Sequence, residues 1–391
     1  MDRPPIPVTI LTGFLGAGKT TLLNKILTAH HGKKIAVIEN EFGEIGIDQD
    51  LVIHAEEEIF ETSNGCLCCT VRGDLIRILN HLLKRRNRFD YILIETTGLA
   101  DPAPILQTLY FDENLKQMLQ LDAVVTLVDC KHIEKHFSDN EVQQQIAFAD
   151  VILLNKIDLV TPETIHSLEK AIHGINPSAK ILRTLKGDVS MDEIFNIGSG
   201  SLDRLEEKEN ELLTLTSQLS LTSISDSTPD HFHTNHSHTN HSHPDHDHSK
   251  CGSDCDHHSH GHAHPLETSA GKTDALNESL TDYRVLHNPA VSSIGIQLPG
   301  DIDMDKLNDW LSNLLAEQGE NIYRMKGILS IADNNHRLIF QGVHMTLDSA
   351  EGSEWGETER LNKLVFIGKN LDREQLTNEF ARLITTPKKH R

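Results

Sequence analysis

The most specific chemical signal in the chain is a glycine-rich loop that ends in lysine and threonine. Residues 13–20 follow the pattern G-x-x-x-x-G-K-[ST], in which backbone N–H groups at the start of a helix surround phosphate groups. Eight fixed positions between a β-type run and a helical run argue against a chance glycine-rich turn. Lys19 is expected to reach the β- and γ-phosphates of a nucleotide, and the Thr20 hydroxyl to bind Mg²⁺. The residues expected to contact the nucleotide here are Gly13, Phe14, Leu15, Gly16, Ala17, Gly18, Lys19, Thr20 and Thr21.

A second short motif points to the base of that nucleotide. Asn155, Lys156 and Asp158 form an N-K-x-D box directly after an apolar run, 151–154. A carboxylate at Asp158 accepts two hydrogen bonds from the N1–H and exocyclic amine of guanine. Adenine offers neither donor, so ATP would leave the carboxylate unsatisfied. An ordinary turn has the same composition, but the position downstream of the glycine-rich loop favours GTP over ATP.

A carboxylate between these two motifs is the expected partner of the magnesium ion. Glu95 ends the apolar run 91–94 and begins the sequence E-T-T-G. It is expected to orient Mg²⁺ or a water on it, while Gly98 allows the backbone to approach the γ-phosphate. The catalytic residues expected are therefore Lys19, Thr20 and Glu95. Leu99 follows Gly98 where a water-positioning glutamine would stand, so the sequence names no general base and predicts slow hydrolysis.

Three cysteines lie within four residues, at Cys66, Cys68 and Cys69. One interpretation is a buried apolar cluster, because free cysteine packs well. A second is redox chemistry through Cys66 and Cys69. The favoured interpretation is a metal site, because thiolates select Zn²⁺ or Cu(I) and three of them leave one tetrahedral position for a further ligand.

Alternating strand and helix patterns position these motifs. Short runs rich in Val, Ile and Leu alternate with helical patterns such as 72–86, which predicts a doubly wound, mostly parallel sheet of the P-loop NTPase type over residues 1–197. In such a fold, ligands bind at the carboxyl ends of the strands. The strands expected are 8–11, 34–38, 91–94, 123–128 and 151–154.

Composition limits the function further. The chain has 391 residues, a net charge of −22 and 38% hydrophobic residues, and it contains no apolar run of the ~20 residues needed to span a bilayer. Strong acidity argues against nucleic-acid binding. The first strand is expected to begin within a few residues of Met1, which leaves no room for a signal peptide. We therefore expect a cytoplasmic protein whose cysteines are thiols or metal ligands.

Residues 198–283 differ in character from the rest of the chain. They contain 15 acidic and 4 basic residues and few large apolar ones, which predicts a largely disordered linker. Within it, the tract 231–264 holds 13 of the 25 histidines, with repeated His-x-His spacing. Such a tract binds Zn²⁺, Ni²⁺, Co²⁺ or Cu²⁺ with little selectivity, as a buffer or delivery segment. A polar linker with no metal role is the alternative. Elsewhere, His132 and His136 have the spacing to chelate a metal on a helix, although a solvated face is the commoner outcome.

A small α+β domain is expected over residues 284–391. Its apolar patterns predict the order β-α-β-β-β-α with an antiparallel sheet. The expected elements are strands at 293–298, 322–331, 337–347 and 363–367, and helices at 304–317 and 373–383.

Together, these motifs resemble the CobW-type P-loop GTPases, metallochaperones related to the GTPases that insert nickel into hydrogenase and urease. The resemblance covers nearly the whole chain, including the C-terminal domain and the His-rich insertion before it. The segments that carry it are 13–20, 39–44 (E-N-E-F-G-E), 66–69 (C-L-C-C), 95–102 (E-T-T-G-L-A-D-P) and 155–158.

The resemblance implies a metal site and a function. Cys66, Cys68 and Cys69 correspond to the family's metal-binding cysteines, and Glu39 and Glu44 are expected as carboxylate ligands. The chain is then a GTPase that uses GTP and Mg²⁺ and delivers Zn²⁺, or alternatively Co²⁺, to a client metalloenzyme of unknown identity. A homodimer is allowed; nucleic acid and membrane partners are not expected. A nucleotide-gated metal store and a cobalt chaperone for cobalamin synthesis are the alternatives. The N-terminal docking peptide of some zinc-related members is not expected here.

Overall fold

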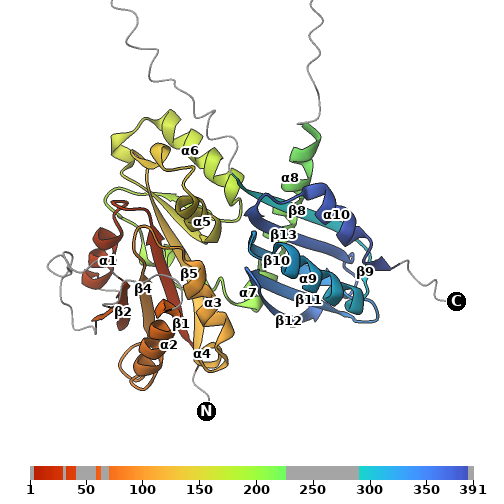
Figure 1. Cartoon of the computed structure of the whole chain (residues 1–391), viewed down its shortest axis with the longest axis horizontal. Helices are drawn as coiled ribbons and strands as arrows, with labels where there is room; N and C mark the ends of the chain where they lie inside the picture. Colours follow the sequence, from red (N-terminus) through yellow and green to blue (C-terminus); the bar gives the residue numbers. More distant parts are fainter. Residues whose placement is uncertain (1–3, 30–31, 41–58, 63–69, 226–289, 386–391) are drawn as a thin grey trace, which may run out of the picture. The chain divides into compact units, whose positions relative to one another are not determined.

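The computed structural model describes residues 4–29, 32–40, 59–62, 70–225 and 290–385 (Figure 1). The histidine tract 231–264 lies outside these ranges, so its predicted metal role stays a prediction. No helix in the described part of the chain has both the length and the apolar character needed to cross a bilayer.

The first sheet has seven strands in the order β3-β2-β4-β1-β5-β6-β7, and all neighbouring pairs are parallel. The doubly wound parallel sheet expected from the sequence is confirmed. Its two edge strands, β3 and β7, are short and were not foreseen. The strands are β1 Ile6–Gly13, β2 Ile35–Asn40, β3 Ile59–Thr62, β4 Tyr91–Glu95, β5 Leu119–Asp129, β6 Val151–Asn155 and β7 Lys180–Arg183.

Helices cover both faces of this sheet because its strands are apolar on both faces. In β4, Leu93 packs in one apolar cluster with Leu22 and Ile26 of α1, whereas its neighbour Ile94 packs in the opposite cluster with Leu106 of α3. Successive side chains of a strand point to opposite faces, so a continuous apolar run serves both layers. The helices are α1 Lys19–Thr28, α2 Thr70–Leu83, α3 Ala103–Phe111, α4 Glu113–Met118, α5 Asn140–Phe148 and α6 Pro162–Ile175, with 3-10 turns η1 Ile133–Lys135, η2 Ile157–Leu159 and η3 Met191–Glu193.

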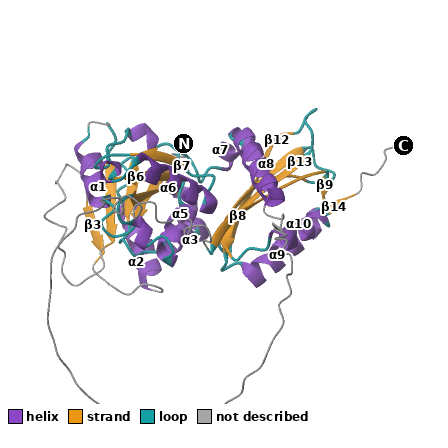
Figure 2. Cartoon of the chain, turned by 90° about the horizontal axis from the view of Figure 1, so that it is seen from above, coloured by secondary structure: helices purple, strands orange, loops and turns teal. Residues whose placement is uncertain are grey.

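The second sheet is antiparallel, with the order β12-β11-β10-β13-β8. Figure 2 shows α9 and α10 on one face of this sheet and α8 on the other. Trp310 of α9 and Phe380 of α10 pack in the core between helices and sheet, with their ring centroids 5.5 Å apart. The elements are β8 Val291–Pro299, β9 Asp301–Ile302, α9 Met304–Gln318, β10 Ile322–Ser330, β11 His336–Val343, β12 Thr346–Glu354, β13 Leu361–Lys369, α10 Arg373–Ala381 and β14 Ile384–Thr385.

One strand prediction in this domain was wrong. Residues 337–347 were expected to form a single strand, but β11 ends at Val343 and the chain turns back into β12 at Thr346. The turn uses His344, whose φ is 50°. A left-handed backbone at a residue other than glycine is uncommon, so the turn had no glycine to mark it. Strand β12 consists mostly of acidic and small residues and therefore lacks the apolar alternation that would predict a strand.

The linker prediction was also wrong at its amino-terminal end. Within 198–283, residues Leu202–Glu207 form α7 and Glu209–Ser225 form α8. Helix α8 packs closely on the antiparallel sheet, because a Cβ at Gly295 would lie 2.8 Å from Leu219 Cβ. Glu209 also forms ion pairs with Arg337 and Lys363. Tertiary packing therefore stabilises a segment whose composition alone reads as unstructured.

A buried ion pair joins Asp150, the residue before β6 of the parallel sheet, to Arg324 on strand β10. Asp150, just before β6, accepts a hydrogen bond from Arg324 Nη2 at 2.5 Å and one from the Val124 N–H at 2.9 Å. Both charged side chains are only 7% exposed. Burial raises the pKa of Asp150, but Arg324, Lys326 and the Val124 N–H together hold it below its usual value.

Replacing Arg324 by alanine should therefore destabilise the protein strongly. The change leaves Asp150 buried without its main partner, which costs ~3–5 kcal/mol in the free energy of unfolding. Because the pKa of Asp150 is lowered in the folded protein, the pair's contribution is complete above the ordinary aspartate pKa near ~4 and disappears as the pH falls further. Urea unfolding at pH 7 and at low pH measures both effects.

The matched control is Arg183→Ala, which removes an exposed ion pair to Glu169. Such a pair contributes only ~0–1 kcal/mol. Equal losses in the two variants would show that the buried pair has no special weight in stability.

Candidate nucleotide-binding site

The glycine-rich loop runs from the end of β1 into α1, and glycine is required at two of its positions. A Cβ at Gly13 would lie 2.3 Å from the carbonyl oxygen of Leu127, and one at Gly18 would lie 2.6 Å from Asn155 Nδ2. Both residues also have positive φ, 137° and 107°. Only glycine meets both conditions at no steric cost.

Lys19 is folded back over this loop. Its ammonium donates hydrogen bonds to the carbonyl oxygens of Gly13 at 2.8 Å and Phe14 at 3.4 Å, and the side chain is 9% exposed. The positive charge thus lies at the amino-terminal end of α1, where the helix dipole also attracts anions. This arrangement fits the phosphate groups of a nucleotide.

The predicted magnesium partners lie together. The Thr20 hydroxyl donates to Glu95 Oε1 at 3.4 Å, which is possible because β1 and β4 are neighbours and Leu11 is paired with Glu95. Two residues on, Thr97 Oγ1 is buried and has no hydrogen-bond partner among the described residues. A buried hydroxyl usually has a partner. A hydroxyl, a carboxylate and an unsatisfied hydroxyl at one edge fit Mg²⁺ bound beside a phosphate.

Gly98 lies against the phosphate loop itself. A Cβ there would be 2.6 Å from the backbone nitrogen of Leu15, so the segment after β4 and the loop touch backbone to backbone. Gln145 of α5, 1% exposed, donates through Nε2 to the carbonyl oxygens of both Gly98 and Ala100 at 3.1 Å. We did not foresee Gln145 from the sequence, where it is one of three consecutive glutamines in a helical pattern.

The residues of the N-K-x-D box differ in their contacts. Asn155 donates through Nδ2 to the Ala17 carbonyl at 2.9 Å and accepts from the Gly187 N–H at 3.0 Å. It therefore joins the phosphate loop to the loop that follows β7, which the sequence analysis did not include in the site. Asp158 lies in η2 and is exposed, as a residue that reads a bound base must be.

Lys156 is held by an aspartate that the sequence analysis missed. Its ammonium donates to Asp129 Oδ2 at 2.7 Å, and Lys156 itself has φ of 61°. Burial raises the pKa of Asp129, but its hydrogen bonds from Lys156 and His132 lower it overall. Asp129 is the last residue of β5, a strand end beside β6, so the position alone could have indicated it.

The proposed chelating pair His132 and His136 is not on an α-helix. The two residues flank the 3-10 turn η1, and each bonds a carboxylate, Asp129 at 2.9 Å and Asp139 at 2.8 Å. His136 also stacks on Phe14 of the phosphate loop, with ring centroids 4.4 Å apart. The pair therefore supports the site's framework. Among the described residues, no group of three or more His, Cys, Asp or Glu is placed to hold a metal ion.

Of the predicted metal ligands, only Glu39 lies within the described ranges; Glu44, Cys66, Cys68 and Cys69 do not. Glu39 on β2 is paired in register with Glu95 on β4. Neighbouring parallel strands lie about 4.8 Å apart, and paired residues point to the same face. Val37 and Leu93, two residues earlier, both face α1. Glu39 and Glu95 thus point to the same face at the same edge.

The segment that follows Gly98 contacts the antiparallel sheet. The Asp101 carboxylate accepts from the Ala103 N–H at 2.8 Å and interacts electrostatically with His344, and burial raises its pKa. His344 is 9% exposed, and burial lowers its pKa. Phe148, at the end of α5, packs its ring against Tyr323 and His344 with centroids 5.7 and 5.4 Å apart. Helix α5 therefore touches both the nucleotide edge and the second sheet.

Comparison with known proteins identifies the family. Residues 7–183 match the model "CobW/HypB/UreG, nucleotide-binding domain", and residues 291–384 match "Cobalamin synthesis protein cobW C-terminal domain". The chain is 32% identical over 384 residues to the zinc chaperone YjiA of Escherichia coli, covering 97% of this chain and 99% of that protein. It is 34% identical over 391 residues to zinc-regulated GTPase metalloprotein activator 1 of Schizosaccharomyces pombe, covering 94% of this chain and 84% of that one.

A solved structure agrees over nearly the same length. The crystal structure of Zn(II)-bound YjiA GTPase from E. coli aligns with a TM-score of 0.66 and 29% identity, over 98% of this chain and 100% of that chain. The resemblance deduced from the motifs is thus confirmed. The chain belongs to the CobW/HypB/UreG family, with the CobW C-terminal domain following its nucleotide-binding domain.

Proposed function

We propose that this protein is a GTP-hydrolysing zinc metallochaperone. It binds GTP and Mg²⁺ at the phosphate loop, holds Zn²⁺ through Cys66, Cys68 and Cys69, and delivers the ion to a client metalloenzyme in step with its nucleotide state. The names of its relatives, a zinc chaperone and a zinc-regulated GTPase, support the assignment.

The observation that carries the proposal is the pairing of Glu39 with Glu95. Glu95 is the expected magnesium partner, and Glu39 is an expected ligand of the transported metal. The chain leaves the sheet after Asn40 and again after Thr62, two paired positions at the same carboxyl edge, and it enters the cysteine segment from there. A change at the γ-phosphate therefore acts within one strand spacing of Glu39, an expected ligand of the transported metal.

The described residues have separate tasks in hydrolysis. Lys19 neutralises charge on the β- and γ-phosphates, and the hydroxyl of Thr20 with the carboxylate of Glu95 holds the magnesium ion. Mg²⁺ supplies charge stabilisation between the phosphates when it is bound. The buried Thr97 hydroxyl gains a partner when the γ-phosphate or its water is present. Asp158 selects guanine, while Asn155 keeps the base-reading loop in register with the phosphate loop.

Helix α5 gives the C-terminal domain a means of sensing the nucleotide. Gln145 donates hydrogen bonds to the segment after β4, and Phe148 packs on Tyr323 and His344 of the antiparallel sheet. A displacement of Gly98 on loss of the γ-phosphate moves α5 or breaks two buried hydrogen bonds. The antiparallel sheet is thus the surface on which the nucleotide state is read by a client.

Glu95→Gln should reduce GTP hydrolysis about 100-fold while the protein stays folded. The substitution keeps the shape of the side chain but removes the charge beside the magnesium ion. Single-turnover hydrolysis at saturating GTP measures the loss, and circular dichroism checks the fold. Glu113→Gln, on the exposed first turn of α4, is the control that should leave hydrolysis unchanged. Wild-type hydrolysis in Glu95→Gln would remove this residue from the site.

Hydrolysis should respond to free Zn²⁺ through the cysteines. In wild-type protein, buffered Zn²⁺ changes the GTPase rate, and the triple change of Cys66, Cys68 and Cys69 to Ser abolishes the response; Glu39→Gln weakens it. The same titration with Co²⁺ tests the cobalt alternative. A GTPase rate that changes with neither metal would show that the cysteine site is not coupled to hydrolysis, and would favour a GTPase with an attached metal store. If the protein transfers Zn²⁺ to an apo-enzyme no faster than free Zn²⁺ reaches it, the result would favour a storage protein over a chaperone.

Gln145→Met should uncouple the C-terminal domain from the nucleotide. The change leaves two buried carbonyl groups without their donor, at a cost of ~1–3 kcal/mol. In wild-type protein, hydrogen exchange of residues 322–347 should differ between the GTP-analogue and GDP states, and the difference should vanish in the variant. Gln143→Met, on the same helix but bonded to the Phe137 carbonyl, is the control. A difference that persists in Gln145→Met would assign the coupling to another contact.

A further inference from the structure

A cavity of about 920 Å³ lies at the edge of the parallel sheet opposite the phosphate loop. Its walls come from the start of β6, the loops at 177–180 and 196–199, helices α7 and α8, and strand β10. Asp150 stands at the amino-terminal end of its strand, whereas the phosphate loop lies at the carboxyl ends. The cavity is therefore separate from the nucleotide site, and its volume is in the range of small-molecule pockets.

Positive charge exceeds negative charge in this cavity. The charged residues that line it are Lys180, Arg204, Lys208, Lys326, Asp150 and Glu211. Lys180 is paired with Glu193 and Arg204 with Glu207, while Asp150 is already held by Arg324. Within the described residues, Lys208 has no acidic group within 4 Å, and Lys326 has only Asp150, at 3.9 Å. The two lysines thus form the uncompensated positive part of the cavity.

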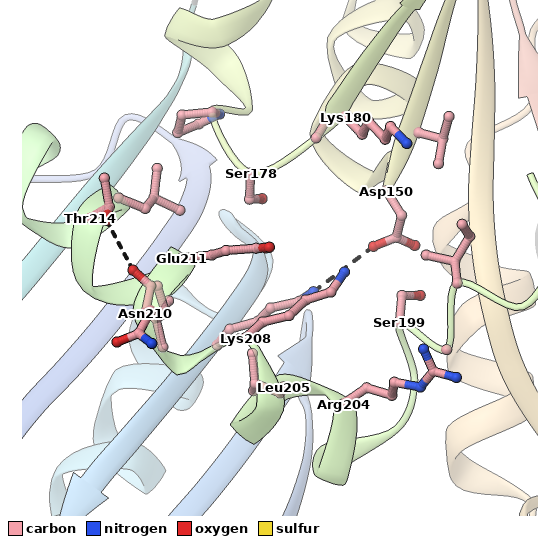
Figure 3. A pocket seen from close by; sticks show the side chains of 18 of the residues that line it. Asp150, Ser178, Lys180, Ser199, Arg204, Leu205, Lys208, Asn210, Glu211 and Thr214 are labelled. Carbon is pink, nitrogen blue, oxygen red and sulfur yellow. Dashed lines mark hydrogen bonds and ion pairs between the residues drawn. The ribbon is translucent and has the colours of Figure 1, made fainter. Parts of the chain in front are cut away.

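Lys326 and Lys208 approach one another closely enough to interact. Figure 3 shows Lys208 reaching across the cavity toward Asp150, with Ser199 beside that carboxylate. Lys326 is 20% exposed. Burial and the like charges of Arg324 and Lys208 together lower the pKa of Lys326 to about 7, against the opposing effect of Asp150. A bound anion relieves both the desolvation of Lys326 and its repulsion from Lys208.

Part of the cavity lining is apolar. Leu205, Leu212 and Leu215 of α7 and α8 are among the lining residues, together with Ile197. Apolar lining with a few convergent charged groups is the usual composition of a site for an organic molecule. Two lysine ammonium groups match the double negative charge of a phosphate monoester.

We propose that this cavity binds a small organic phosphate, with its phosphate group on Lys208 and Lys326 and its apolar body against Leu205, Leu212 and Leu215. The cavity joins both sheets through Asp150 and β10, so the ligand acts as an effector at the contact between them. The assignment does not depend on the proposed zinc delivery.

Phenyl phosphate is a suitable probe, because it combines one phosphate monoester with an apolar ring. Binding is measured by isothermal titration calorimetry with GDP and Mg²⁺ saturating the nucleotide site, so that the phosphate loop is closed to the probe. Lys208→Ser and Lys326→Met should each weaken binding about tenfold, the loss expected for one charged hydrogen bond. Lys170→Ser, an exposed lysine on α6 outside the cavity, should bind as wild type. Unchanged GDP affinity shows that each variant is folded.

The pH dependence gives an independent readout. Phenyl phosphate is a dianion above pH 7, because the second pKa of a phosphate monoester is near ~6. The charged groups that act on Lys326 are Arg324, Asp150 and Lys208. The pKa of Asp150 is held below its usual value, so this carboxylate stays ionised from neutral to weakly alkaline pH. Affinity should therefore fall as Lys326 loses its proton, and this dependence should disappear in Lys326→Met.

Three results would overturn the assignment. One is the absence of saturable binding in the millimolar range. Another is equal binding by wild type, Lys208→Ser and Lys326→Met. The third is equal binding of phenol, which has the ring without the charge. Weaker binding of phenol and of inorganic phosphate than of phenyl phosphate would support both the charged and the apolar parts of the site.

Discussion

The buried side-chain amide of Gln145 links the nucleotide-binding edge of the parallel sheet to the antiparallel sheet. Gln145 donates from its side chain to the carbonyl oxygens of Gly98 and Ala100, and thereby fixes the segment that lies against the phosphate loop. Both carbonyls would otherwise be buried without a donor, which is costly. Because Gln145 stands on α5, whose last residue packs on Tyr323 and His344, the segment, the helix and the antiparallel sheet are mechanically continuous.

The parallel register explains why the site collects residues so far apart in sequence. In a parallel sheet the carboxyl ends of all strands meet at one edge, and paired residues point to one face. That geometry places Glu39 beside Glu95 on the α1 face, where the Thr20 hydroxyl at the start of α1 reaches Glu95. It also places Asp129 beside Lys156, since β5 and β6 end at the same level. Neither arrangement requires a special local sequence.

The sequence was informative where one residue type is compulsory. Glycine at positions 13 and 18, the lysine and threonine after them, and the buried strands all follow from local sterics or from apolar runs. The sequence was silent where a common residue gains its role from tertiary contact: Gln145 among three glutamines, Asn155 as a bridge between loops, and α8 as a helix stabilised by the sheet beneath it. Strand β12 was missed for a related reason, since an edge strand made mostly of polar and small residues carries little apolar signal.

The two cations near the buried carboxylate of Asp150 have different roles, one in stability and the other in ligand binding. Arg324 satisfies Asp150 with a short hydrogen bond and also donates to the Phe148 carbonyl, so the carboxylate needs no second cation. Lys326 nevertheless stands 3.9 Å from the same carboxylate, with another lysine for a neighbour. A methionine there would avoid the desolvation of an ammonium group and keep the packing. Lys326 therefore costs stability and is not needed for the ion pair. Its role is to bind a ligand anion in the cavity, and that anion compensates the charge of the lysine.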